Sequence, residues 1–265
     1  MIDQFKHKKI GVICGGYSRE RTISMQSGQN IHNALVQLGY HSKIIDFAEE
    51  NAINTICDIA FIALHGSDGE DGSLQLVLNQ KKMAYTGSDV EASLISNNKI
   101  LTKVWCEENA IPVPKYQRIS TILRELPDSF SYPVIVKPIQ EGSSIDVYII
   151  DNEAQLLDKT KGLIEKYAQF LLEEYIEGKE VTIGIIDNPL PQLLPILELR
   201  PKNRFYDFEA KYTKGLTEFV LPADISLSEK QLIHNYADCI YRKINAKGMA
   251  RVDFLICPKK GPLLL

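Results

Sequence analysis

Residues 9–21 read KIGVICGGYSRER, in which a short apolar run leads into two glycines and then into a charged segment. The apolar run has the length and composition of a buried strand, and residues 22–38 predict a helix that ends at Gly39, a common left-handed stop. Further strand-like runs lie at 42–47 and 59–64. Because strands and a helix alternate, we expect a parallel, helix-covered sheet over roughly the first ninety residues.

The two glycines lie where a sheet of this kind binds ligands, at the carboxyl end of a strand. The spacing of Gly15 and Gly16 fits neither G-x-G-x-x-G nor G-x-x-x-x-G-K-[ST], which disfavours a nicotinamide dinucleotide site. Glu20 follows as a candidate substrate contact, although a residue favoured by the dipole at a helix N terminus is the simpler interpretation. His65 follows the end of the next strand, in the segment ALHGSDGEDG (63–72). It is either a structural histidine or a second substrate contact at the same sheet edge.

The rest of the chain alternates between strand-like and helical patterns. Strands are predicted at 132–137, 147–150, 170–175, 181–186 and 193–199, and helices at 90–109, 152–168 and 228–244. A polar, aromatic loop is expected at 200–214, and Ser228 with Gln231 predicts a capping box for the last helix. From these patterns we expect three domains, at 1–93, 94–176 and 177–265.

Two strand ends in the middle of the chain carry charged residues suited to a nucleotide. Lys137 lies in the apolar run VIVKP (134–138), and the small, hydroxyl-rich loop EGSS (141–144) follows it. A lysine under such a loop can bind phosphates, although a solvated lysine at a strand end is the alternative. Glu173, near the end of the strand-like run LEEYI (172–176), is suited to an adenine amino group and a ribose.

Two further segments combine charge with apolar character. FYDFEAKY (205–212) has neither helical nor strand periodicity and predicts a lid over a site. In RVDF (251–254), Arg251 and Asp253 share one face of a predicted strand, and the two apolar residues share the other. The charged pair is either a surface ion pair, or a guanidinium and a carboxylate placed to stabilise an oxyanion and bind a divalent metal.

The composition is that of a soluble globular enzyme. Hydrophobic residues make up 45% and charged residues 24% of the 265 residues, which is enough to bury a sizeable core. The net charge of −4 argues against nucleic-acid and acidic-membrane partners. The polar N-terminal segment resembles neither a signal sequence nor a membrane span, so we expect a cytoplasmic location. The five cysteines include no C-x-x-C pair and are expected to be reduced.

Seven blocks in this order resemble the D-alanine–D-alanine ligases of the ATP-grasp superfamily: GGYSxER, ALHGxxGEDG, YTGS, VIVKP with EGSS, FYDFEAKY, PAD and RVDF. The resemblance extends from about Lys9 to Leu265. It implies a mixed α/β and α+β fold, with a Rossmann-like N-terminal domain followed by a two-lobed ATP-grasp. It also implies an enzyme that uses ATP to join two D-alanines through an acyl phosphate, for peptidoglycan synthesis. A homodimer is usual in this family.

The resemblance also implies a role for each matching residue. Lys99, Lys137, Ser144 and Lys211 would bind the phosphates of ATP, and Glu173, Ile176 and Glu180 would hold its adenine and ribose. Glu20 would hold the ammonium group of the first D-alanine and form a hydrogen-bonded triad with Ser143 and Tyr212, while His65 would line that subsite. Arg251 would stabilise the tetrahedral oxyanion, and Asp253 would be a ligand of Mg²⁺, with Mn²⁺ as a substitute.

The sequence departs from the family pattern at two places. Asp146 stands where the family usually has glycine, which adds a side chain and a charge near the phosphates. The family's Glu-x-Asn magnesium pair would follow Leu265, and we therefore expect the chain to be a fragment. Two alternatives stay open: a catalytically inactive nucleotide-binding relative, and a ligase with D-lactate or D-serine as acceptor, although Tyr212 favours D-alanine.

Overall fold

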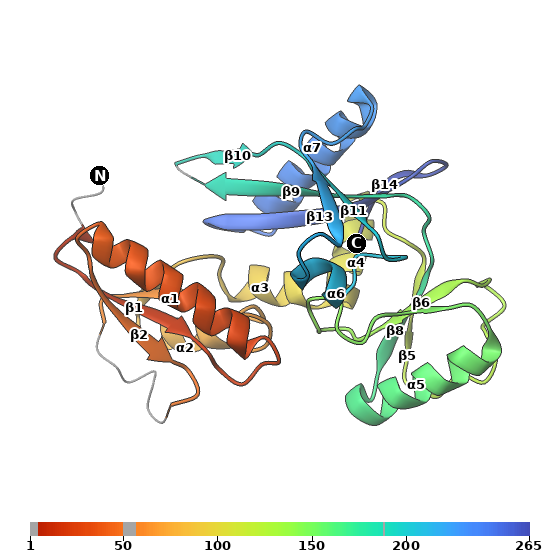
Figure 1. The fold of residues 1–265 in the computed structure, drawn as a ribbon, viewed down its shortest axis with the longest axis horizontal. Coiled ribbons are helices and arrows are strands. Elements are labelled where there is room, and N and C mark those ends of the chain that lie inside the picture. Colours follow the sequence, from red (N-terminus) through yellow and green to blue (C-terminus); the bar gives the residue numbers. More distant parts are fainter. Residues whose placement is uncertain (1–4, 50–56, 188) are drawn as a thin grey trace. The chain divides into compact units, whose positions relative to one another are not determined.

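The computed structural model describes residues 5–49, 57–187 and 189–265, and the side chain of Tyr212 lies outside that description. The chain divides into two compact units (Figure 1). The first unit comprises Met1–Asn97 with Ile244–Gly248, and the second comprises Asn98–Lys243 with Met249–Leu265.

The first unit contains a parallel sheet with strand order β2-β1-β3-β4, as the alternation of strand and helix predicts. The strands are β1 (Lys9–Cys14), β2 (His41–Asp46), β3 (Ile59–Ile62) and β4 (Ala84–Tyr85). The helices are α1 (Arg21–Gln37), α2 (Ser73–Gln80) and α3 (Val90–Asn97).

Successive residues of β1 are buried on opposite faces of this sheet. Val12 and Cys14 pack with Met25 of α1, while Ile13 packs with Leu74 and Leu78 of α2. A strand that is apolar on both faces needs a covering layer on each side. The two helices supply those layers and leave the carboxyl ends of the strands for the loops that carry Glu20 and His65.

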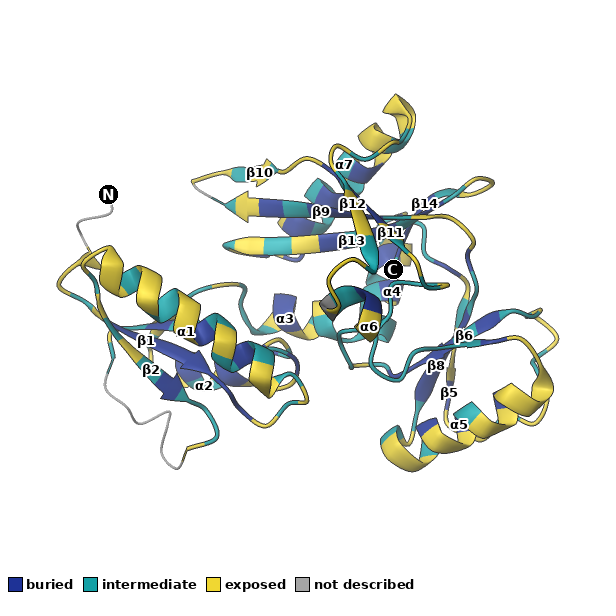
Figure 2. Ribbon diagram, in the orientation of Figure 1, coloured by how far each residue is buried: buried dark blue, intermediate teal, exposed yellow. Residues whose placement is uncertain are grey.

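The second unit begins with α4 (Lys99–Glu108) and an antiparallel sheet of order β5-β8-β6-β7. Its strands are β5 (Tyr116–Ile119), β6 (Val134–Lys137), β7 (Tyr148–Ile150) and β8 (Phe170–Glu174). Helix α5 (Glu153–Tyr167) packs on this sheet through Leu156 and Leu163. Figure 2 shows the opposite face of α5 exposed.

A six-stranded antiparallel sheet follows, with order β12-β11-β9-β13-β14 and β10 paired to β9. The strands are β9 (Lys179–Asp187), β10 (Pro191–Leu193), β11 (Leu197–Pro201), β12 (Thr217–Val220), β13 (Met249–Cys257) and β14 (Gly261–Leu264). Helix α7 (Leu227–Lys243) packs on this sheet, and the short helix α6 (Phe208–Tyr212) lies between β11 and β12 in the sequence.

The single helix predicted for 90–109 is wrong. Asn98 has extended backbone, with φ −100° and ψ 105°, and its side chain accepts hydrogen bonds from the backbone N–H groups of Ile100 and Leu101. It therefore caps a new helix, α4, instead of continuing α3. The break also falls where the first unit ends and the second begins.

Three other local predictions need correction. The strand predicted at 193–199 is divided between β10 and β11. The loop predicted at 200–214 contains α6, because the Asp207 carboxylate accepts from the Ala210 N–H at 2.8 Å and starts a helical turn. The capping box of α7 is made by Ser226 and Glu229, whose side chains accept from each other's backbone N–H groups at 2.8 and 3.2 Å.

Among the described residues, no helix combines the length and the apolar character needed to cross a lipid bilayer.

Candidate active site

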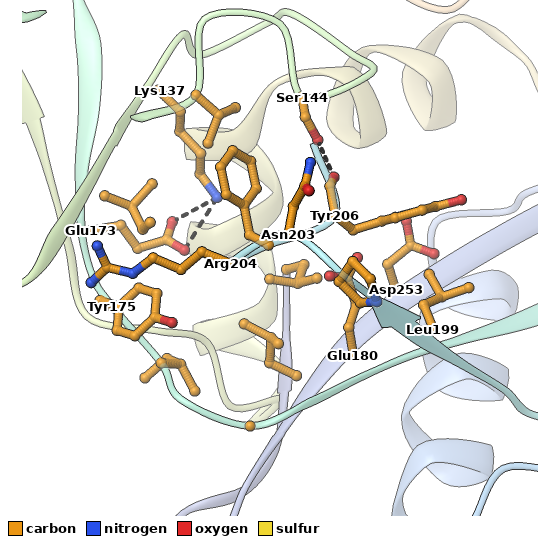
Figure 3. Close-up of a pocket in the computed structure, with 18 of the residues that line it drawn as sticks. Lys137, Ser144, Glu173, Tyr175, Glu180, Leu199, Asn203, Arg204, Tyr206 and Asp253 are labelled. Carbon is orange, nitrogen blue, oxygen red and sulfur yellow. Dashed lines mark hydrogen bonds and ion pairs between the residues drawn. The ribbon is translucent and has the colours of Figure 1, made fainter. Parts of the chain in front are cut away.

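A cavity of about 650 Å³ lies in the second unit and is lined by segments of both of its sheets (Figure 3). Its lining includes the site residues predicted for this unit other than Tyr212: Lys99, Lys137, Ser143, Ser144, Glu173, Ile176, Glu180, Lys211, Arg251 and Asp253. The structure therefore gathers residues from α4, β6, the loop after β6, β8, β9, α6 and β13 around one space.

Glu173 is the centre of a buried charge cluster on one side of this cavity. Its Oε2 lies 3.1 Å from Lys137 Nζ and 3.0 Å from Lys103 Nζ. Burial alone would raise the pKa of Glu173, but the two ammonium groups lower it below its ordinary value. Glu173 is thus held ionised, and Lys137 is bound to a carboxylate instead of being a solvated lysine at a strand end.

Lys103 is a part of this cluster that the sequence analysis missed. Its side chain is buried on α4, and its ammonium group lies 5.3 Å from the centre of the Tyr116 ring. Burial lowers the pKa of Lys103, and the charge of Glu173 opposes that effect. A signal was present in the sequence, because Lys103 follows Lys99 by four residues and so shares its helix face.

Lys99 occupies the first position of α4, beside the loop that follows β6. Its Nζ donates to the Glu141 carbonyl at 2.7 Å, and its backbone N–H donates to the Ile139 carbonyl at 3.0 Å. Burial, and then the nearby charge of Lys137, lower the pKa of Lys99 to about 7. Near neutral pH the amine is therefore poised to gain a proton when an anion enters the cavity.

We call residues 142–147 the phosphate loop, after the phosphate contact predicted for Ser144. Ser143 and Ser144 both have positive φ, 49° and 57°, and the Ile145 N–H donates to the Gly142 carbonyl at 3.0 Å to close a turn. The Ser144 hydroxyl donates to the Tyr206 carbonyl at 2.9 Å, as Figure 3 shows. The phosphate loop is thus joined directly to the segment predicted to be a lid.

We call residues 202–216 the lid loop, after the lid predicted at 205–212. The Lys202 N–H donates to the Leu216 carbonyl at 2.8 Å and closes the base of this loop. Lys211 Nζ lies 5.2 Å from the centre of the Tyr206 ring. Arg204 forms a bidentate pair with Asp151, at 2.7 and 2.8 Å, and its guanidinium lies 5.3 Å from the centre of the Tyr175 ring. The lid loop is therefore fastened to the sheet that carries Lys137.

Neighbouring strands β9 and β13 carry the acidic end of the cavity. Arg251 makes two hydrogen bonds to Asp253, each of 2.9 Å, and the Thr182 hydroxyl donates to Asp253 Oδ1 at 2.6 Å. Burial, and then the charge of Asp253, raise the pKa of Glu180 to about 7. The cavity thus has Lys137 beside Glu173, Lys99 beside the phosphate loop, and Arg251 paired with Asp253 on β13.

The described residues do not form a complete metal site. Among residues 5–49, 57–187 and 189–265, no group of three or more His, Cys, Asp or Glu residues could hold a metal ion. The oxygens of Asp253 are engaged by Arg251 and Thr182, so a cation would have to compete with both. A hard divalent cation usually takes six or more oxygen ligands, and one carboxylate supplies only part of that set.

Glu20 and His65 meet at the strand ends of the first unit. The Ser18 hydroxyl donates to the His65 carbonyl at 2.6 Å and accepts from the Glu20 N–H at 3.2 Å. A Cβ on Gly66, which has φ 73°, would lie 3.0 Å from Glu20 Oε2, so the close approach of the carboxylate favours glycine there. A hydrogen bond to Glu70 raises the pKa of His65, and burial opposes it.

Arg21 and Asp46 brace the loop that contains Gly15 and Gly16. The sequence analysis did not identify this pair. Arg21 NH1 donates to Asp46 Oδ1 at 2.8 Å and to the Gly16 carbonyl at 3.0 Å. The hydrogen bond from Arg21 lowers the pKa of Asp46 to about 2, against a smaller effect of burial. The pair joins the end of β2 to the segment that leads into Glu20.

Comparisons with known proteins match this arrangement over most of the chain. The sequence model of the D-ala D-ala ligase C-terminus matches residues 109–265. The D-alanine–D-alanine ligase of Pseudothermotoga lettingae is 40% identical over 253 residues, which cover 94% of this chain and 84% of that protein. The solved D-alanine–D-alanine ligase of Bacillus anthracis has a TM-score of 0.83 and 28% identity, covering 97% of this chain and 85% of that one. Its complex with ATP has a TM-score of 0.82 and 26% identity, covering 97% of this chain and 84% of that one.

Proposed function

Because the chain belongs to the D-alanine–D-alanine ligase family, we propose that it joins two D-alanines with the use of ATP, for peptidoglycan synthesis. The carboxylate of the first D-alanine attacks the γ-phosphorus, which releases ADP and forms an acyl phosphate. The amine of the second D-alanine then attacks the acyl carbon, loses a proton and displaces inorganic phosphate. The product is D-alanyl-D-alanine.

The observation that best supports this function is the convergence of Lys99, Lys137 and Lys211 on one cavity. The transferred phosphoryl group carries negative charge throughout the reaction, so catalysis depends on positioned positive charge and hydrogen-bond donors. We infer that the three lysines contact the phosphates of ATP. Ser144 and the backbone N–H groups of the phosphate loop cover the same phosphates.

Other residues of the same lining suit the nucleoside. Glu173 is ionised and can accept a hydrogen bond from the amino group of adenine, and Ile176 supplies an apolar surface. Glu180 can accept a hydrogen bond from a ribose hydroxyl, since its pKa near 7 leaves it largely ionised above neutral pH. These roles are proposals that rest on the cavity lining and on the family relationship.

We propose Arg251 as the group that stabilises the tetrahedral oxyanion of the second step. A guanidinium presents donors in a fixed plane, and the bidentate bond to Asp253 holds that plane in one orientation. We propose Glu20 for the ammonium group of the first D-alanine, with His65 beside it in the first unit. The triad of Glu20 with Ser143 and Tyr212 stays a prediction of the family resemblance. Asp253 stays the proposed carboxylate contact for Mg²⁺ or Mn²⁺, through Oδ2, which accepts one hydrogen bond from Arg251 and has a second lone pair.

Two properties of the whole protein are also proposals. A homodimer is the assembly usual in the family, and sedimentation would test it. A cytoplasmic location agrees with the use of ATP and D-alanine as substrates. No nucleic-acid or membrane partner is proposed, in keeping with the net charge of −4.

The function is tested by phosphate release from ATP, with D-alanine, L-alanine, D-serine or D-lactate supplied in turn and with Mg²⁺ present. We expect release with D-alanine alone, and a product with the mass of the dipeptide. L-alanine is expected to fail, because with its ammonium and carboxyl groups bound in the same places its methyl group would point where D-alanine has a hydrogen. Equal release with L-alanine would overturn the proposal, and ATP binding without release would favour the inactive relative.

A further inference from the structure

Asp146 holds a backbone conformation that non-glycine residues seldom adopt. Its φ is 55°, and Ser143 and Ser144 earlier in the same loop have φ of 49° and 57°. Several left-handed residues so close together persist only when the surrounding structure determines them. Aspartate tolerates this region better than most residues, but glycine would adopt it more readily.

The carboxylate of Asp146 is bonded to the end of the neighbouring helix. It accepts hydrogen bonds from the hydroxyl of Tyr148 at 3.1 Å and from that of Tyr167 at 2.5 Å, and it pairs with Lys166. Lys166 and Tyr167 are the last residues of α5. Because α5 is held to its sheet by buried leucines, these donors stand on a rigid element.

The charge of Asp146 is kept out of the nucleotide cavity. Ser143, Ser144 and Val147 line the cavity, whereas Asp146 is not among its lining residues. Burial would raise the pKa of Asp146, but hydrogen bonds from Lys166, Tyr167 and Tyr148 hold it below its ordinary value. An added carboxylate in a phosphate loop is therefore turned toward α5, where its charge is compensated.

The phosphate loop is thus fastened at two points. Asp146 bonds it to α5, and the Ser144 hydroxyl bonds it to the lid loop through the Tyr206 carbonyl at 2.9 Å. A segment fixed in this way loses less conformational freedom when a nucleotide binds than a free glycine-rich loop does. The conformational entropy of the loop is lost when the protein folds, and not when the nucleotide binds.

We propose that Asp146 is a positioning residue that anchors the phosphate loop to the end of α5, and so preorganises Ser144 and the backbone N–H groups of that loop for the nucleotide phosphates. The inference rests on the proposed function, since it assumes that this cavity binds ATP. It identifies a role for an acidic side chain at a position where a glycine would make the backbone conformation easier.

Asp146→Gly is the decisive variant, because it relieves the backbone strain and removes the anchor together. We expect KM for ATP to rise about tenfold, as for loss of a charge-assisted hydrogen bond, with a smaller change in kcat. Tyr167→Phe, which keeps the ring and the aspartate, should raise KM in the same direction. Glu165→Gln removes a charge from an exposed residue on the same turn of α5 and should leave KM unchanged.

Coupling between Asp146 and Tyr167 distinguishes the loss of an anchor from general damage to the fold. If Asp146 acts through Tyr167, the double variant D146N/Y167F should raise KM by no more than the larger of the two single changes. Amide hydrogen exchange in residues 142–147 should be faster in D146G than in the unchanged protein, whether or not D-alanine supports turnover. Because exchange is measured without turnover, it tests the anchor even if the proposed function fails.

An unchanged or lower KM for ATP in D146G, together with unchanged exchange in residues 142–147, would overturn the proposal. It would mean that Asp146 only occupies a left-handed position that glycine fills as well. Additive effects of D146N and Y167F would also contradict it, since independent sites add and an anchor and its donor do not.

Discussion

The ammonium group of Lys103 lies 3.0 Å from Glu173 Oε2, and both side chains are 3% exposed. Lys137 Nζ approaches the same oxygen at 3.1 Å from the strand beside it. One carboxylate therefore compensates two positive charges taken out of water. Such a cluster is stable only while the carboxylate remains between the ammonium groups.

Glu173→Gln should destabilise the protein more than the loss of either lysine. It leaves two buried ammonium groups facing each other, and breaking a buried pair costs about 3 to 5 kcal/mol. Lys103→Met leaves Glu173 paired with Lys137, so we expect a smaller fall in the free energy of unfolding. Urea titrations followed by circular dichroism measure both. A larger loss in K103M than in E173Q would contradict this account of the cluster.

ATP binding should take up protons near pH 8 because of Lys99. The pKa of Lys99 is lowered from 10.5 to about 7, so the free amine is mostly neutral at pH 8, and incoming phosphates favour its protonated form. Uptake at Lys99 could reach about 0.9 of a proton. Calorimetry in buffers of different ionisation enthalpy measures the total, to which Glu180 also contributes.

Two variants separate these contributions. Lys99→Arg keeps a permanent charge and should remove its share of the uptake, while Glu180→Gln removes any proton change at Glu180 and should leave the share of Lys99. Equal proton uptake in K99R and in the unchanged protein would show that Lys99 does not titrate on binding.

Asp46→Asn should weaken the first unit and flatten its response to acid. The pKa of Asp46 is lowered from 3.8 to about 2, so its stabilisation is present above about pH 4 and is lost as the pH falls through 2. At pH 7 we expect a loss of about 1 kcal/mol, since Arg21 is partly exposed. Circular dichroism between pH 4 and 2 should show a shallower decline in D46N. An identical acid profile in the two proteins would contradict the assignment.

Arg251→Lys should reduce turnover while leaving ATP affinity nearly unchanged. Lysine cannot reproduce the two hydrogen bonds of 2.9 Å to Asp253, so the cation loses its fixed plane. Loss of one preorganised oxyanion contact costs about a hundredfold in kcat or more. Steady-state kinetics and nucleotide titration of the same preparation measure the two effects. Loss of ATP affinity with kcat preserved would assign Arg251 to the nucleotide instead.

Local patterns predicted the elements that depend on near neighbours. The run at 9–14 is β1, the helix predicted at 22–38 is α1 within one residue, and the last helix is α7. Hydrophobic periodicity is a property of a few consecutive turns, so it can be found without knowing the fold. The same reasoning failed at Asn98, since the residues on both sides of it have helical composition.

Order of motifs identified the family, and with it the residues that line the cavity. The sequence alone did not reveal Lys103 as a partner of Glu173, the bond of Arg204 to Asp151, or the brace between Arg21 and Asp46. Each of these pairs joins residues that are remote in the chain. Charge compensation depends on distances between elements, which only the packed structure sets.

Asp146 shows most clearly what the sequence determined and what depended on the tertiary structure. The sequence established that a carboxylate stands at a position where the family usually has glycine, and that this position follows Ser143 and Ser144. Which way the carboxylate points was decided by the tertiary structure, which places the hydroxyl of Tyr167 and the ammonium group of Lys166 beside it. A side chain turns toward the donors that compensate its charge, and those donors come from the far end of a helix whose position depends on the packing of the whole sheet.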